Sequence, residues 1–253
     1  GTRRHGETSA ILEVMTRGHG RHLPEPSTPF LAREAELAAV RQMLSRDTVR
    51  LVTLVGPGGV GKTRLALEIA RTVSPELPDG VCYVGLADVR DPNLVLSAIA
   101  RAGGAAADAA VVAFRDFEGL LVLDNFEHVA DAAPVITTLL EGCRGLSVLV
   151  TSRSPVHVGA EHVYTVPPLL VPPTLDHADI EVVQKAPAVR LFLDRARARR
   201  HDFDLTPGNA ASIAAVCAAV DGLPLAIVLA AAHIDMLSPG DLLTRLKARL
   251  PLP

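Results

Sequence analysis

Residues 56–63 read Gly56-Pro57-Gly58-Gly59-Val60-Gly61-Lys62-Thr63, and this stretch decides the fold. It matches G-x-x-x-x-G-K-[ST], the pattern of the phosphate-binding loop, and a chance match over this length is on the order of 10⁻³. An apolar run, 49–55, precedes it and a helix-like run, 64–70, follows it. A strand that ends in a glycine turn and then a helix predicts a P-loop that binds a nucleoside di- or triphosphate.

The loop is expected to bind phosphate through its backbone and through side chains. Glycine has no Cβ, so the backbone can approach the phosphates closely and adopt positive φ. The candidate backbone donors are Gly58, Gly59, Val60 and Gly61. Lys62 is expected to reach the β- and γ-phosphates, and the Thr63 hydroxyl is expected to ligate Mg²⁺. Arg64, which follows directly, is a further candidate for nucleotide binding.

The composition describes a globular chain of 253 residues, enough for one large domain or two modest ones. Hydrophobic residues make up 49% of the chain, which suffices for a core, and aromatic residues only 3%, so Ala, Leu and Val must do the packing. The net charge of −3 gives no sign of a surface that binds polyanions along the whole chain. No apolar stretch reaches the roughly 18 residues that span a bilayer, so no membrane contact is expected.

The cysteines indicate a reducing compartment. Cys82, Cys143 and Cys217 are far apart in the sequence, and each lies in an apolar run. Buried free thiols are therefore expected, which predicts a cytoplasmic location. The nine histidines show no metal-binding spacing.

The residue pattern along the chain predicts a tail, an α/β domain, a linker and an all-α domain. Residues 1–27, rich in Arg, Gly, His and Thr, read as an N-terminal tail or linker. Over 28–168 strand-like and helix-like runs alternate, which predicts a parallel sheet flanked by helices. Prolines punctuate a polar segment, 169–186, and this segment reads as a linker because proline discourages helix. Residues 187–253 show helical patterns only and predict a small helical domain.

The apolar runs give the expected elements. The strands are expected at 51–55, 81–86, 120–124, 146–151 and 162–166, each as a continuous apolar run covered on both faces. Helices are expected at 34–44, 63–72, 93–101, 108–114, 130–142 and 188–199. Three more are expected after these: one capped by Thr206 and ending near 220, one from Pro224 to about 236, and one capped by Ser238.

A second nucleotide element is the strand that ends at Asp124, about sixty residues after the loop. A carboxylate at the end of a buried strand can hold Mg²⁺, directly or through water. Asn125 stands where many P-loop ATPases carry a second acidic residue, and an amide can position water but cannot take its proton. Glu127 or His128 could take that role; the alternative is that each is a helix-start or surface residue.

A third element is the strand that ends in Thr151-Ser152-Arg153. Open α/β sheets bind ligands at the carboxyl ends of their strands. If this strand lies beside 51–55, Arg153 can sense the γ-phosphate and Thr151 can form a hydrogen bond near it. The alternative is an arginine that caps an exposed edge.

Together these motifs resemble the STAND class of signal-transduction NTPases, and most closely bacterial transcriptional regulators with a module similar to NB-ARC. The resemblance covers roughly residues 22–253. Six blocks carry it in order: 23–34, the phosphate loop, 123–128, 149–153, 188–192, and Gly222-Leu223-Pro224-Leu225-Ala226. The loop alone is generic, whereas the ordered set ending in G-L-P-L is specific.

The resemblance implies an ATP- and ADP-binding switch with Mg²⁺ and slow hydrolysis. It implies that the backbone near Leu31 and the side chain of Arg33 contact the base and a phosphate, and that Pro224 packs against adenine. Arg153 would be the sensor. The family has Gly in place of Ala32, so a positive φ there would require the adjoining loop to shift. The candidate catalytic residues are Lys62, Asp124 and Glu127, and the metal ligands are Thr63 and Asp124.

The resemblance also implies partners. The family continues with a winged-helix domain and sensor repeats, so DNA would be bound only through a domain outside this chain. ADP would hold the domains closed, and ATP would favour an open form that assembles into a homo-oligomer. Two other interpretations stay open: a phosphoryl-transfer ATPase or kinase with fast turnover, and a scaffold that binds ADP and ATP equally.

Overall fold

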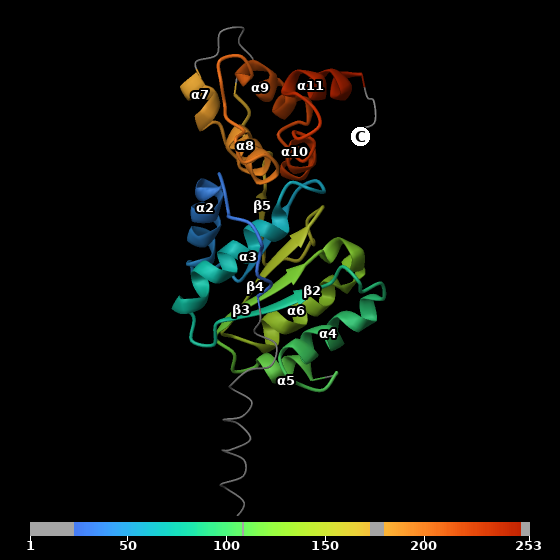
Figure 1. Ribbon diagram of the computed structural model, residues 1–253. Coiled ribbons are helices and arrows are strands. Elements are labelled where there is room, and N and C mark those ends of the chain that lie inside the picture. Colours follow the sequence, from blue (N-terminus) through green and yellow to red (C-terminus); the bar gives the residue numbers. More distant parts are fainter. Residues whose placement is uncertain (1–22, 108, 173–179, 249–253) are drawn as a thin grey trace, which may run out of the picture. The chain divides into compact units, whose positions relative to one another are not determined.

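The computed structural model describes residues 23–107, 109–172 and 180–248, which form two compact units (Figure 1). Of the described residues, the sheet unit comprises 23–27, 36–56, 62–107 and 109–165. The helical unit comprises 28–35, 57–61, 166–172 and 180–248. Most of the expected N-terminal tail, residues 1–22, lies outside the described residues.

The sheet unit is built on one five-stranded parallel sheet, as the sequence predicts. Its strands are β1 (Leu51–Val55), β2 (Val81–Gly85), β3 (Gly119–Asp124), β4 (Leu146–Ser152) and β5 (Glu161–Thr165). Their order is β2-β3-β4-β1-β5, so β1 lies between β4 and β5. The carboxyl ends of β3 and β4 lie at the same edge of the sheet as the carboxyl end of β1, after which the phosphate loop begins.

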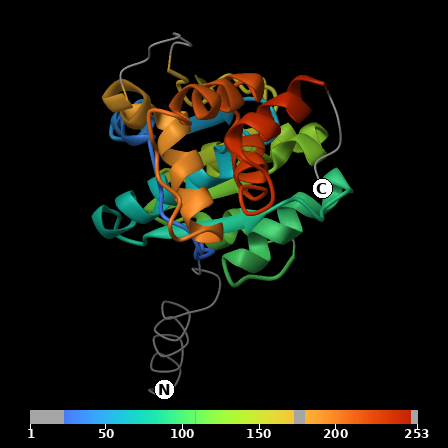
Figure 2. The same ribbon diagram turned by 45° about the horizontal axis from the view of Figure 1, so that its top comes forward.

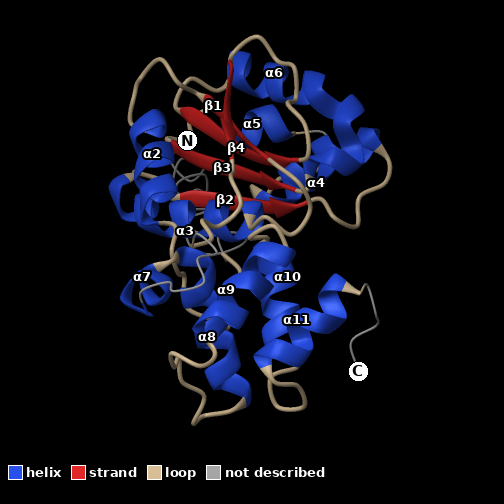
Figure 3. Ribbon diagram, turned by 90° about the horizontal axis from the view of Figure 1, so that it is seen from above, coloured by secondary structure: helices blue, strands red, loops and turns tan. Residues whose placement is uncertain are grey.

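Helices cover both faces of this sheet (Figures 1 and 3). On one side α3 (Lys62–Val73) packs against β1, β3 and β4. On the other side α4 (Val95–Ala102), α5 (Ala110–Phe114) and α6 (Ala133–Gly142) share a hydrophobic cluster with the strands. Strands β1 and β3 are therefore buried along their whole length. Helix α2 (Glu34–Leu44) has the predicted bounds.

Three expectations for the sheet unit need correction. Strand β5 was expected to be an apolar run covered on both faces, but it contains polar residues and most of its side chains are accessible. The reason is that β5 forms one edge of the sheet. Helix α6 begins at Ala133, since a 3₁₀ segment, η3 (Phe126–Ala132), precedes it and is interrupted at Val129. Helix α4 also begins late, after a 3₁₀ turn, η2 (Pro92–Leu94). A further 3₁₀ turn, η1 (Ser74–Glu76), follows α3.

The helical unit contains five helices in the described residues, drawn in orange to red in Figure 2. They are α7 (Ile180–Lys185), α8 (Pro187–Arg199), α9 (Ala210–Ala219), α10 (Pro224–Ala231) and α11 (Pro239–Lys247). Their core includes the fully buried side chains of Phe192, Ile213, Ile227 and Leu242. None of the helices among the described residues is both long and apolar enough to cross a bilayer.

The helical elements differ from the prediction in detail. Thr206 is not an N-cap: its N–H donates to Asn209 Oδ1 (2.8 Å), and α9 begins only at Ala210. Helix α10 ends at Ala231, with turns after it, and not near residue 236. Helix α7 lies inside the proline-containing segment that reads as a linker. The predicted cap at Ser238 is confirmed, because its Oγ accepts from Asp241 N (3.2 Å).

Candidate nucleotide-binding site

The phosphate loop connects β1 to α3, as the sequence predicts. Gly59 and Gly61 have φ of +79° and +98°, a conformation that side-chain-bearing residues rarely adopt. Val60 between them is fully buried. Backbone conformation therefore explains why Gly59 and Gly61 are glycines.

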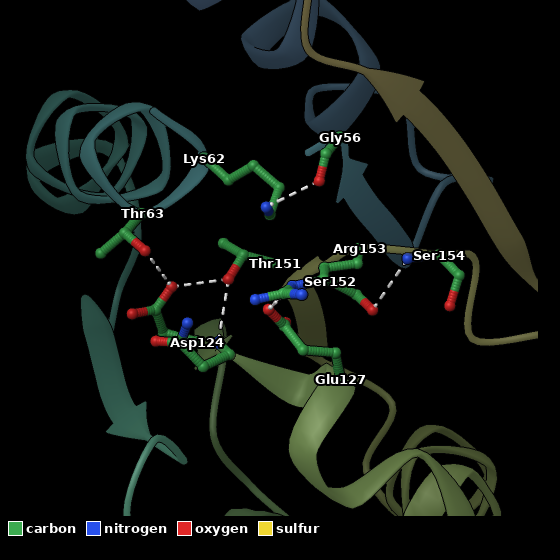
Figure 4. A network of polar contacts seen from close by, with 10 residues as sticks. Gly56, Lys62, Thr63, Asp124, Glu127, Thr151, Ser152, Arg153 and Ser154 are labelled. Carbon is green, nitrogen blue, oxygen red and sulfur yellow. Dashed lines mark hydrogen bonds and ion pairs between the residues drawn. The ribbon is translucent and has the colours of Figure 1, made fainter. Parts of the chain in front are cut away.

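Lys62 is the buried cation of the loop. Its Nζ donates to the carbonyl oxygen of Gly56 at 2.8 Å (Figure 4). Burial lowers the pKa of Lys62; the negative charges of Glu127 and Asp124 act in the opposite direction, while Arg153 adds to the lowering. A phosphate oxygen is a stronger partner for an ammonium group than a carbonyl is, so this position suits a bound phosphate.

Asp124 is the centre of a polar cluster at the end of β3 (Figure 4). Its side chain is buried, and Thr63 Oγ1 donates to its Oδ1 at 2.8 Å. Thr151 Oγ1 donates to the same oxygen at 2.6 Å and accepts from Asn125 N at 2.9 Å. The loop threonine, the strand carboxylate and the neighbouring strand hydroxyl are thus brought together.

Tyr83 is a member of this cluster that the sequence interpretation missed. Its hydroxyl donates to Asp124 Oδ2 at 3.0 Å. Burial raises the pKa of Tyr83, and the adjacent Asp124 charge and hydrogen bond raise it further, so the phenol stays a neutral donor. Gly85 pairs with Asp124 in the sheet, and Tyr83 lies two residues earlier on the same face. The contact between Tyr83 and Asp124 could be predicted only if β2 and β3 were known to be neighbours.

The donor set fits magnesium that arrives with phosphates. Thr63 and Asp124 offer a hydroxyl and a carboxylate oxygen, both hard ligands that Mg²⁺ prefers. The described residues contain no group of three or more His, Cys, Asp or Glu placed to hold a metal. Mg²⁺ commonly binds through one or two protein oxygens, with waters and phosphates supplying the rest.

Glu127 and Arg153 face each other beside this cluster (Figure 4). Arg153 Nε lies 3.4 Å from Glu127 Oε1; the arginine side chain is 67% exposed and the glutamate side chain 14% exposed. Glu127 Oε2 is buried and has no hydrogen-bond partner. Because β4 does lie beside β1, the condition set for Arg153 as a sensor is met. His128 is exposed, which favours Glu127 over it.

Arg33 binds the phosphate loop inside the helical unit. It is only 4% exposed, and its Nη2 donates to Val60 O at 2.7 Å and to Pro167 O at 2.8 Å. Ala32 has φ of +60°, so the condition under which the adjoining loop was expected to shift is met. The alanine is accommodated with Arg33 in contact with the loop.

The first turn of α10 also contacts the loop within the helical unit. Leu225 N donates to Gly59 O at 3.1 Å. A Cβ placed on Gly59 would lie 2.9 Å from Leu225 Cβ, and one on Gly61 would lie 3.9 Å from Pro224 Cγ. The G-L-P-L segment and the phosphate loop, far apart in the sequence, are therefore neighbours.

The predicted residues thus fall into two groups. The sheet unit brings together Lys62, Thr63, Asp124, Glu127 and Arg153, with Arg64 following in the first turn of α3. The helical unit brings together Arg33, the loop residues Gly58, Gly59, Val60 and Gly61, and Pro224. Leu31, also in that unit, packs against its core. The roles of these residues stay predictions.

Known proteins were compared with the chain. No model of a protein family matches it. "Uncharacterized protein Rv0894" of Mycobacterium tuberculosis is 40% identical over 240 residues, which are 92% of this chain and 56% of that protein. "Putative HTH-type transcriptional regulator Rv0890c" of the same organism is 38% identical over 211 residues, 80% of this chain and 22% of that protein. "Regulatory protein AfsR" of Streptomyces griseus is 30% identical over 229 residues, which are 84% of this chain and 21% of that protein.

The chain therefore spans about half the length of the first of these relatives and about a fifth of the others. Among solved structures, Cdc6p from Pyrobaculum aerophilum superposes with a TM-score of 0.52 at 14% identity, covering 94% of this chain and 67% of that one. At this identity the likeness concerns the fold alone. The chain has the fold of P-loop NTPases and is similar in sequence to bacterial regulatory proteins.

Proposed function

We propose that this chain is the ATP- and ADP-binding switch module of a larger regulator, one that hydrolyses ATP slowly. One observation carries the proposal: Lys62, Thr63 and Asp124 converge at the carboxyl ends of β1 and β3, directly after a glycine loop. This is the edge at which open α/β sheets bind ligands. The regulatory proteins among the relatives support the wider role.

In the proposed complex the loop amides and Lys62 bind the phosphates. The lysine exchanges its hydrogen bond to Gly56 O for one to a phosphate oxygen, which also relieves the cost of its burial. Thr63 and Asp124 are the residues that would hold Mg²⁺, directly or through water. A bound Mg²⁺ would neutralise phosphate charge. Tyr83 and Thr151 keep the Asp124 carboxylate oriented.

Slow hydrolysis follows from the residues that could activate water. Asn125, after the metal-binding carboxylate, cannot accept a proton. Glu127 is the proposed base, and its partner Arg153 is the proposed γ-phosphate sensor. An ion pair between them competes with both roles, because each side chain is then engaged by the other and not by water or a phosphate oxygen.

We further propose adenine as the base, with Leu31 and Pro224 as its contacts, on the family resemblance. ADP and ATP would then bias two conformations of the regulator by their different affinities for each. ATP-dependent self-assembly and DNA binding through another domain of the longer protein belong to the same proposal. Three free buried cysteines fit a reducing cytoplasm.

Two measurements test the proposal. Mass spectrometry of the nucleotide that co-purifies with the protein should find ADP or ATP; GDP would contradict the adenine assignment. Calorimetry should show Mg²⁺-dependent binding of both nucleotides that Lys62→Ala abolishes, with Lys185→Ala as a control because Lys185 is exposed. Undiminished binding by Lys62→Ala would refute the site.

Turnover and selectivity separate the alternatives. A switch should hydrolyse ATP far more slowly than the roughly 10 s⁻¹ of a median enzyme. Turnover in that range would favour a phosphoryl-transfer enzyme. Equal affinity for ADP and ATP would instead favour a scaffold, because a scaffold that holds nucleotide structurally has no need to distinguish the two.

A further inference from the structure

Two consecutive carbonyl groups of the phosphate loop are held by residues from elsewhere in the helical unit. Gly59 O accepts from the N–H of Leu225, at the start of α10, and Val60 O accepts from Nη2 of Arg33. Leu225 lies 166 residues after Gly59 in the chain, so neither contact arises from local sequence. The loop is therefore anchored at two adjacent peptide groups.

These anchors determine where the loop amides point. A trans peptide is planar, and its C=O and N–H point in opposite directions. Holding Gly59 O therefore directs the N–H of Val60 the opposite way, and holding Val60 O does the same for the N–H of Gly61. Val60 and Gly61 are two of the predicted phosphate donors; in the structure the Val60 N–H donates to Pro57 O at 3.4 Å, a long hydrogen bond that a phosphate oxygen would replace. The anchors orient binding groups without occupying the phosphate position themselves.

Arg33 is built into this anchor firmly. It is almost fully buried, and the same nitrogen that binds Val60 O also binds Pro167 O, so one guanidinium joins three chain segments. The residue before it, Ala32, adopts the left-handed conformation, which alanine adopts at a free-energy cost. A strained backbone next to a buried, multiply bonded arginine indicates that its placement matters.

We propose that Arg33, together with the first turn of α10, is a positioning element that presets the phosphate loop. If the loop binds phosphate, as proposed above, this positioning sets the affinity for phosphate through the loop backbone. That consequence rests on the proposed function. The positioning role departs from the family-based expectation that the Arg33 side chain acts on the nucleotide itself. The two roles differ in the ligand-free protein, where only a positioning residue has an effect.

The test is amide hydrogen exchange of the loop, measured by NMR in the ligand-free full chain. Arg33→Ala and Arg33→Lys each lose the forked donor, and Leu225→Pro removes the N–H while a first-turn position tolerates proline. We expect exchange at Val60 and Gly61 to accelerate about tenfold or more, as loss of a charged hydrogen bond implies. Arg190→Ala is the control, because Arg190 pairs with Glu34 on the exposed surface of the same unit.

Affinities for Mg·ADP, Mg·ATP and inorganic pyrophosphate give the second readout. Positioning predicts a similar loss for all three, since each uses the loop amides. Unchanged exchange at Val60 and Gly61 in the Arg33 variants, with or without loss of nucleotide binding, would overturn the inference. If Arg33→Ala does not fold, Arg33→Lys and Leu225→Pro decide. If the wild-type protein binds no nucleotide, the proposed function is wrong, but the exchange experiment still tests the positioning role because it uses the ligand-free protein.

Discussion

Replacing Gly222 by alanine tests how tightly the G-L-P-L segment is built. Gly222 has φ of +64°, and a Cβ there would overlap the carbonyl oxygen of Leu169 and lie 3.3 Å from its carbonyl carbon. The left-handed conformation costs alanine about 1–2 kcal/mol. Backbone must also move, which endangers the hydrogen bond from Leu169 N to Gly222 O (2.9 Å), worth about 1 kcal/mol. The expected loss of unfolding free energy is about 2–4 kcal/mol.

Urea denaturation followed by circular dichroism measures this loss. With a slope of about 2–3 kcal/mol per molar urea, the midpoint should fall by roughly 1 M. Gly208→Ala is the matched control: Gly208 is exposed, and its nearest neighbour to a new Cβ is Thr206 Oγ1 at 3.8 Å. That variant should stay within about 0.5 kcal/mol of wild type. Equal midpoints for Gly222→Ala and wild type would refute the steric reasoning.

Three further predictions concern the site. The lowered pKa of Lys62 means that the folded state disfavours its charge, so the stability of ligand-free wild type relative to Lys62→Met should rise as the pH rises toward 10.5; a flat difference in urea midpoints would contradict this. The raised pKa of Tyr83 has the opposite effect, because the folded state favours the neutral phenol: its contribution to the free energy of unfolding is complete below about pH 10 and is lost as the pH rises further. Raising the pH above 10 should therefore destabilise Tyr83→Phe less than wild type. Parallel plots of unfolding free energy against pH for the two proteins would refute the assignment. Ala32→Gly relieves about 1 kcal/mol of left-handed strain but removes a buried methyl worth about 0.8 kcal/mol, so its urea midpoint should match that of wild type. Ala32→Val should destabilise the protein by about 2 kcal/mol, because a β-branched side chain fits the left-handed conformation poorly. Equal urea midpoints for wild type and both variants would show that the position is not strained.

The parallel sheet was predictable because its strands carry strong signals. Each expected strand lies within one residue of its observed bounds, and for the four strands other than β5 the reason is that a buried apolar run between turn residues leaves few alternatives. That Thr63 and Asp124 lie side by side was predictable for a similar reason, because motif spacing and the end of a strand fix their positions together; their roles stay predictions. The neighbourhood of β1 and β4, on which the role of Arg153 depends, could only be stated as a condition.

The remaining features depend on tertiary contacts that no local pattern encodes. Tyr83 reaches Asp124 only because β2 and β3 are adjacent, and Arg33 reaches Val60 O across 27 residues. The start of α9 was misplaced for a local reason: Thr206 N donates to Asn209 Oδ1, a turn that competes with the apparent cap at Thr206. Strand β5 was misjudged because edge position, which sets its exposure, is a property of the whole sheet.

The backbone at Asn125 limits how this chain could evolve toward rapid turnover. Its φ and ψ are 63° and 42°, a conformation that short polar side chains tolerate better than long ones. Installing glutamate there would supply a carboxylate but would force it into the same unfavourable backbone region, at about 1–2 kcal/mol. A carboxylate at this position would therefore require the turn after β3 to be rebuilt as well as the side chain exchanged, so the proposed slow turnover has a conformational basis beside the chemical one.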